Sequence, residues 1–290
     1  MHGAVNKVTL AARIKSYRRH PFSFAVMCVV LLAAIITAAI LFFIIAYILV
    51  KGVPNLKPSL FAWEYSSENV SMTPALINTL ILTLLTLAFA VPIGICAAVY
   101  LTEYARRCSR LVEAIRLTTE TLAGIPSIVY GLVGYLLFNV KLGWGYSLLG
   151  GALTLAMMIL PLIIRTSEEA ILAVPDSYRE GSFGLGAGRL RTVVRIVLPS
   201  AASGIVSGVI LGIGRVFGET AALIFTAGTV AGIADGVLGS GRTLSVHMYS
   251  LLSEGLHTDE AYATAVVLLV LSALINGCSA FAAKKVGSKK

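Results

Sequence analysis

The chain has 290 residues, of which 57% are hydrophobic and 13% are charged, and its mean hydropathy is +0.88. Soluble domains carry roughly 25% charged residues, so this composition excludes a water-soluble globular, disordered or collagen-like protein. The formal charge of +9 arises from 23 basic and 14 acidic residues. The four cysteines have no CxxC spacing, which excludes a disulfide framework and a cysteine metal site.

Six long apolar stretches follow one another along the chain. A helix needs about 20 apolar residues to cross a bilayer, and backbone groups in lipid must be bonded within a helix or a closed barrel. The stretches are too uniformly apolar for barrel strands, which alternate. We therefore predict an all-α polytopic membrane protein with six transmembrane helices, the first of them an uncleaved span. The stretches are residues 22–50, 75–101, 121–140, 142–164, 198–234 and 261–283.

The basic residues divide unequally between the two sides of this arrangement. Eighteen fall on the side that holds both termini, and four fall on the other. Because basic residues stay in the cytoplasm, we predict cytoplasmic termini, with an N-terminal segment of residues 1–21 and a tail of residues 284–290. The net charge of +9 is then explained by the orientation of the chain in the membrane, and nucleic-acid binding is not expected. The minority side carries Lys51, Lys57, Lys141 and Arg242.

Motifs of resident chemistry are missing from the sequence. There is no GxxxxGK[ST] nucleotide loop, no HExxH zinc motif and no GxSxG nucleophile elbow, and the four histidines are scattered. An intramembrane enzyme is therefore disfavoured, and this chain is not expected to hold ATP, a cofactor or a metal itself.

The connector between the fourth and fifth stretches, residues 165–197, is long and has the composition of an ordered segment. Pro175 is expected to end one helix, and Ser177 with Glu180 fits a capping box that starts the next. Gly184, Gly186 and Gly188 allow a sharp turn between two short helices. Such an amphipathic pair either lies on lipid or docks into a partner's groove, and these residues alone do not decide between the two.

This connector resembles a motif of the permease subunits of binding-protein-dependent ABC importers. Their motif reads E-A-A, three residues, G, nine residues, I-x-L-P. Here E-G-S at 180–182 is followed by Gly186 and by I-V-L-P at 196–199, with every spacing kept and with Gly181 and Ser182 in place of two alanines. The resemblance implies that the loop 176–199 docks into a partner ATPase. The coupling residues it implies are Glu180, Gly181, Ser182, Gly186, Ile196, Leu198 and Pro199.

Two ionisable residues, Arg215 and Glu219, lie inside the fifth apolar stretch. Ionisable groups in a membrane are costly and are functional candidates. Counted from Leu198 at 1.5 Å per residue, Arg215 is expected about 25 Å along the helix, past the midplane towards the outside. A spacing of four puts both on one helical face. Two interpretations remain open: a salt bridge that braces the helix, or an anion path in which the guanidinium fork binds an oxyanion.

Further strings are similar to permeases of the Pst phosphate-uptake system. They are G-R-V-F-G-E-T-A at 214–221 and P-S-I-V-Y-G-L at 126–132, while R-T-S-E-E at 165–169 and T-A-A-L-I-F-T-A at 220–227 are closer to its PstA subunits than to PstC. This resemblance implies a type I ABC importer permease fold, with an additional first helix at 22–50 and a core domain of five helices at 75–283. It implies a non-catalytic permease subunit of a phosphate importer in the bacterial inner membrane.

The same resemblance implies the partners and the path. The partners are a PstC-type permease, two PstB-type ATPases that bind ATP with magnesium, and a periplasmic phosphate-binding protein. The implied substrate path contains Arg215, Glu219, Thr220 and Ser127, with Arg165 and Glu169 as accessory residues, although a surface ion pair also explains the last two.

A few other polar residues stand out from the apolar background. Asn78, Thr79 and Thr83 are candidates for bonds between helices, and Glu120 is expected to cap the start of the third span. Residues 235–260 are expected to form a docking surface for the binding protein. Two alternatives to phosphate import remain: a permease for another oxyanion such as sulfate, molybdate or phosphonate, and an ion-coupled secondary transporter, which would need no loop shaped for a partner.

Overall fold

A computed structural model of the chain describes residues 21–105 and 110–287, and these residues form helices without any β-strand. The chain divides into two compact units, Met1–Lys51 and Gly52–Lys290. The first is represented by α2 (Pro21–Gly52), a single helix that is apolar on all sides. A helix with this pattern is suited to lipid contact along its whole circumference.

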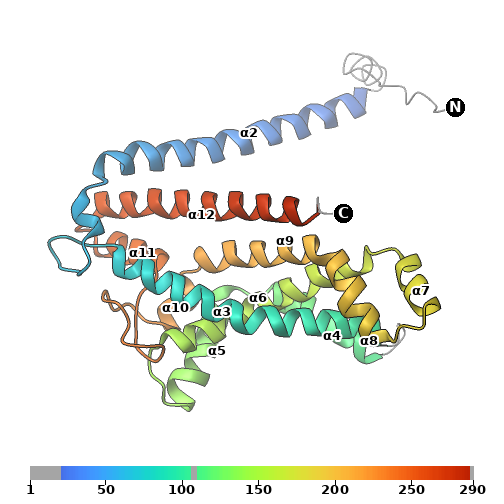
Figure 1. The fold of residues 1–290 in the computed structure, drawn as a ribbon. Helices are drawn as coiled ribbons and strands as arrows, with labels where there is room; N and C mark the ends of the chain where they lie inside the picture. Colours follow the sequence, from blue (N-terminus) through green and yellow to red (C-terminus); the bar gives the residue numbers. More distant parts are fainter. Residues whose placement is uncertain (1–20, 106–109, 288–290) are drawn as a thin grey trace. The chain divides into compact units, whose positions relative to one another are not determined.

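The second unit is a bundle centred on α6 (Figure 1). α6 is the most buried of the long helices, because α3 and α9 pack along it and α5 and α10 cover its far end. The elements of the bundle are η1 (Val53–Asn55), η2 (Pro58–Phe61), α3 (Thr73–Val99), η3 (Tyr100–Tyr104), α4 (Arg110–Ala123), α5 (Ser127–Gly134), η4 (Tyr135–Lys141), α6 (Leu148–Leu172), α7 (Asp176–Gly184), α8 (Arg189–Thr192), η5 (Val193–Val197), α9 (Leu198–Phe217), α10 (Ala221–Thr226), α11 (Leu244–Glu254) and α12 (Thr258–Gly287).

The number of spans agrees with the prediction if one bent pair is counted as a span. Within the described residues, five helices are long and apolar enough to cross a membrane. A sixth span arises if Val112–Ala123 and Ser127–Lys141, which meet at 102°, are taken together. Pro126 stands at this bend and has no N–H to donate, so the helix breaks there.

Three predicted boundaries are wrong for local reasons. The third span, with the bent pair counted as one, begins at Val112 and not at residue 121. The fourth helix begins at Leu148 and not at residue 142, because Ser147 is its N-cap and accepts a hydrogen bond from the Gly150 N–H at 3.2 Å. The fifth ends at Phe217 and not near residue 234, because Gly218 ends α9 and a separate short helix, α10, follows.

The connector between α6 and α9 also differs from the prediction in detail. α6 continues to Leu172, so the helix expected before Pro175 is not separate and forms the last turns of α6. Pro175 is the N-cap of α7, and no side chain caps that helix, so the expected Ser177–Glu180 box is absent. Gly186 makes the turn with φ of +79°, a backbone conformation that favours glycine. The short helix expected after the glycine turn is continuous with α9. Together they form one helical stretch of 29 residues, Arg189–Phe217.

Asn78 on α3 links the long helices to the loop after α10. Its amide Nδ2 donates to the Gly232 and Arg242 carbonyls at 3.0 and 3.3 Å, and its Oδ1 accepts from the Ala234 N–H at 3.1 Å. Thr79 accepts from the Leu244 N–H at 2.8 Å. The predicted bond between helices is therefore confirmed for Thr79, which meets the start of α11. Asn78 bonds to a loop instead, and Thr83 bonds to its own helix.

A buried aromatic and basic cluster follows this loop. The Arg242 guanidinium lies 4.7 Å from the centre of the Tyr65 ring, and His247 on α11 meets the same ring edge-on at 6.3 Å. Burial, and then the nearby Arg242 charge, lowers the pKa of His247 from 6.5 to about 3. His247 is therefore neutral in the folded protein at neutral pH.

This pKa gives the fold an acid-sensitive contribution. Between pH 6.5 and about 3, the unfolded chain binds a proton at His247 that the folded chain does not bind, so stability falls by up to about 1.4 kcal/mol per pH unit as pH decreases. We expect His247→Phe, which keeps a ring beside Tyr65, to lose less thermal stability than the native chain between pH 7 and pH 5. Thermal unfolding of both purified proteins in detergent measures the difference, and parallel pH profiles would count against it.

Candidate functional site

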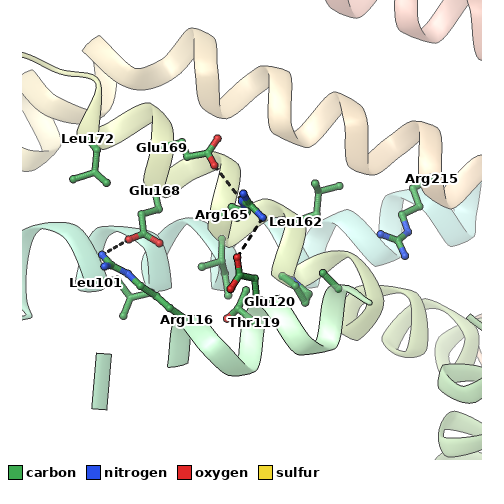
Figure 2. A pocket seen from close by; sticks show the side chains of 13 residues that line it. Leu101, Arg116, Thr119, Glu120, Leu162, Arg165, Glu168, Glu169, Leu172 and Arg215 are labelled. Carbon is green, nitrogen blue, oxygen red and sulfur yellow. Dashed lines mark hydrogen bonds and ion pairs between the residues drawn. The ribbon is translucent and has the colours of Figure 1, made fainter. Parts of the chain in front are cut away.

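A pocket of about 430 Å³ opens between α4 and α6 and is bounded on one side by Arg215 of α9 (Figure 2). It has an apolar floor and a charged rim, which is the pattern of a site for a small polar ligand. The thirteen lining residues are Leu101, Arg116, Thr119, Glu120, Ala123, Pro161, Leu162, Ile164, Arg165, Glu168, Glu169, Leu172 and Arg215.

Ion pairs join α4 to α6 along the rim of the pocket. Arg116 on α4 pairs with Glu168 on α6, and Arg165 on α6 lies 3.9 Å from the Glu120 carboxylate on α4. Arg165 also donates from Nε to Glu169 at 3.1 Å, as the spacing of four predicts (Figure 2). The Arg165 pairs are mostly solvent-exposed, and exposed pairs contribute only about 0–1 kcal/mol, so these contacts exchange readily.

The expected capping role of Glu120 is wrong. Residue 120 lies in the last turn of α4, near the negative end of the helix dipole, and not at a helix start. Its carboxylate faces Arg165 instead.

Glycines on α9 allow it to pack closely against α6 and fix the register between them. A methyl group placed on Gly204 would meet Ala170, one on Gly208 would overlap Thr166, and one on Gly212 would touch Ile159 and Ile163. This pairing places Arg215 opposite the middle of α6, about 9 Å beyond Arg165 at 1.5 Å per residue. Along its own helix Arg215 lies in the last turn of α9, as the count from Leu198 predicts, and its depth in the membrane stays a prediction.

Arg215 has no ion-pair partner among the described residues. α9 ends at Phe217, so residues 215 and 219 do not share a helical face, and that prediction is wrong. Glu219 turns to α10 and accepts a hydrogen bond from the Ala222 N–H at 3.1 Å. The Arg215–Glu219 salt bridge considered from sequence is thus not formed. The Arg215 side chain lines the pocket without Glu219 beside it (Figure 2).

The other predicted path residues lie elsewhere. Thr220 precedes α10 and Ser127 begins α5, and neither lines the pocket. Of the predicted path and accessory residues, the structure therefore gathers Arg215, Arg165 and Glu169 around one cavity. Sequence reasoning missed Glu168 as a site residue and assigned Arg116 only to orientation. Their pairing connects positions 52 residues apart, which no local pattern reveals.

The segment that holds the predicted coupling residues presents a separate surface on α7, α8 and the turn between them. Leu185 is 91% exposed, and Phe183 and Leu190 are also exposed, so an apolar patch faces away from the bundle. Glu180 lies on the exposed side of α7, and a methyl on Gly181 would meet nothing within 4 Å. The alanine-to-glycine departure at Gly181 therefore removes no packing.

Ser182 gives the second departure from the family motif a structural role. Its buried hydroxyl lies 2.8 Å from the Thr192 hydroxyl and joins α7 to α8 across the turn, a bond that alanine does not offer. Beyond the turn, Ile196 is half-buried, Leu198 packs against the cluster around Ile171 and Val197, and Pro199 lies in the first turn of α9. The motif thus presents one face to solvent and anchors the other.

Comparison with known proteins identifies relatives of this arrangement. Residues 90–287 match the family described as binding-protein-dependent transport system inner membrane component. The chain is 35% identical over 261 residues to the probable ABC transporter permease protein YqgI of Bacillus subtilis, covering 84% of this chain and 88% of that one. It is 38% identical over 205 residues to phosphate transport system permease protein PstA 1 of Mycobacterium tuberculosis, covering 70% and 67%.

Solved structures show the same fold at low identity. A bacterial ABC transporter that imports the acidic polysaccharide alginate superposes with a TM-score of 0.66 at 17% identity, over 88% of this chain and 95% of that one. The inward-facing MetNI methionine ABC transporter superposes with a TM-score of 0.57 at 19% identity, over 83% and 97%. These likenesses concern the helical architecture alone.

Proposed function

The chain belongs to the family of binding-protein-dependent transport system inner membrane components, and on that premise we propose that it is the PstA-type permease subunit of an ATP-driven importer of inorganic phosphate. It is a multi-pass, non-catalytic transport subunit, and its family works with an ATPase and a substrate-binding protein. The relatives named PstA support phosphate as the substrate.

The unpaired Arg215 is the observation that carries the proposal. Phosphate is a tetrahedral anion with one to two negative charges at neutral pH, and a low-dielectric pocket disfavours it strongly without a fixed cation. A guanidinium offers parallel N–H donors that fit two oxygens of such an anion. Because no described carboxylate occupies those donors, Arg215 is free to serve a passing anion.

The neighbouring charges suit release as well as entry. Three arginines and three carboxylates line the pocket, so its formal charge balances. Conduction requires that an ion bind weakly enough to leave. The carboxylates of Glu120 and Glu169 beside Arg165 repel a bound anion and so weaken its binding there. Because these ion pairs exchange readily, an anion that leaves Arg215 can pass Arg165.

The proposed assembly follows from the pocket beside Arg215 and from the exposed surface on α7 and α8. A PstC-type permease would complete the path, two PstB-type ATPases would dock on the α7–α8 surface and its counterpart, and a periplasmic phosphate-binding protein would deliver the anion across the bacterial inner membrane. ATP and magnesium would bind to the ATPases. Residues 235–260, which include α11 and the start of α12, remain the proposed docking region for the binding protein. An ion-coupled secondary transporter is not supported, because the family match and the exposed coupling loop both fit an ABC permease.

Arg215→Gln should lower ATP-driven phosphate uptake by roughly tenfold or more while leaving the complex assembled, because charge-assisted hydrogen bonds contribute about 1.5–3 kcal/mol. Arg215→Lys should recover only part of the uptake, since it keeps the charge but loses the fork. Adding Glu219→Gln should restore nothing, because Glu219 caps α10. Uptake of radiolabelled phosphate by proteoliposomes measures all three.

The same assay decides between oxyanions. Excess sulfate, molybdate or phosphonate should not compete with phosphate for uptake by the native complex. Uptake of one of these anions, with none of phosphate, would move the proposal to another oxyanion permease. Recovery of phosphate uptake in the double variant would make Arg215 a brace for the helix and remove it from the anion path.

Gly186→Leu should reduce retention of the ATPase on purification, because a leucine at φ of +79° is strained and must shift the turn between α7 and α8. Gly188→Leu is the matched control. That glycine also has nothing within 4 Å of an added methyl, but its φ is −73°. Equal ATPase retention in both variants would argue against docking through this turn, and a crosslink from native α7 to the ATPase would support it independently.

A further inference from the structure

Arg179, on the buried side of α7, uses its whole guanidinium group. Its side chain is 14% exposed, and it makes five hydrogen bonds. Nε and Nη2 donate to Glu103 Oε1 at 2.9 and 2.8 Å, and Nη2 also donates to the Ile171 carbonyl at 3.0 Å. Nη1 donates to the Val174 carbonyl at 2.8 Å and to Asp176 Oδ1 at 3.0 Å. Five donors are all that arginine has, so the group is saturated.

The partners belong to three different parts of the bundle. Glu103 is 8% exposed and sits in η3, the π-helical turn that ends α3. Ile171 lies in the last turn of α6, and Val174 lies two residues beyond the end of that helix. Asp176 is on α7 itself and is 72% exposed. One side chain therefore fastens α7 to the ends of both α3 and α6.

These two ends lead directly to the pocket. Leu101 at the end of α3 and Leu172 at the end of α6 both line it, and Glu168 and Glu169 lie one turn earlier on α6. The exposed apolar patch of Phe183, Leu185 and Leu190 begins at the end of α7 and continues through the turn into α8. A displacement of α7 would therefore be passed to the pocket-lining ends of α3 and α6 through the hydrogen bonds that Arg179 donates to Glu103 and Ile171.

We propose that the Glu103–Arg179 pair is the positioning contact through which movement of α7 reaches α3 and α6, so that it couples ATP hydrolysis to opening of the pocket. The inference rests on the proposed docking of α7 to an ATPase. Arg179 and Glu103 contact neither the anion nor ATP, and they act by setting where the pocket-lining helix ends lie.

A purely stabilising role gives a different expectation. If Arg179 only capped α6, loss of Glu103 would lower the stability of the subunit without changing how much substrate moves per ATP. The Arg179 guanidinium contacts two carboxylates, Glu103 and Asp176, and each can be changed separately to its amide. Glu103→Gln weakens the link to α3, whereas Asp176→Asn weakens only a surface contact within α7, which is worth little.

The test uses the full complex with its ATPase and binding protein in proteoliposomes. We expect Glu103→Gln and Arg179→Lys to retain the ATPase and to hydrolyse ATP within about twofold of the native rate, but to move roughly tenfold less phosphate per ATP, as for loss of one charge-assisted contact. Asp176→Asn should stay within about twofold of the native ratio. An unchanged ratio in Glu103→Gln, or loss of the ATPase from both link variants, would overturn the proposal.

A second readout does not depend on the identity of the substrate. With the native cysteines replaced by serine, a reporter Thr119→Cys in the pocket should change its labelling rate when ATP is added to the complex. Glu103→Gln should abolish that change while ATP hydrolysis continues, and a persisting change would overturn the proposal. If the native complex moves no phosphate but the reporter responds to ATP, the proposed substrate fails and the coupling inference stands.

Discussion

An unpaired guanidinium in the last turn of a membrane-spanning helix, exposed to a pocket, is the constraint on which the rest of this structure depends. Removing a positive charge from water costs several kcal/mol unless something compensates it. In Arg215 the obvious counter-charge, Glu219, is used instead to cap the next helix. The pocket between α4 and α6 gives the guanidinium room, and a visiting anion would supply the missing partner.

The position of that charge follows from small residues more than from charged ones. Close approach at Gly204, Gly208 and Gly212 fixes α9 against α6 and so sets Arg215 opposite the middle of α6. The break at Gly218 then separates Arg215 from Glu219. Side-chain size along one helix interface thereby decides the electrostatics of the pocket.

Apolar length and basic-residue bias predict the helical class and the span count, because these signals add up over many residues, whereas the family is predicted from the resemblance of the motif at 180–199 and of the strings around Arg215. Spacing predicts the Arg165–Glu169 pair and the exposed turn at Gly186 for the same reason: each is local. The end of α9 and the Arg116–Glu168 pair are not predictable in this way. At the first, the Glu219 carboxylate accepts a hydrogen bond from the Ala222 N–H of the next helix, and the second depends on the packing of α4 against α6.

Chemical restoration of the charge tests the central claim most directly. In a background without native cysteines, Arg215→Cys would be treated with a cationic ethylammonium thiosulfonate or with a neutral reagent of similar size, and phosphate uptake by the reconstituted complex would be measured. If the charge of Arg215 serves the anion, the cationic adduct restores a substantial part of the uptake and the neutral adduct restores none. Equal uptake with both adducts would show that residue 215 contributes bulk and not charge, which contradicts a role in the anion path.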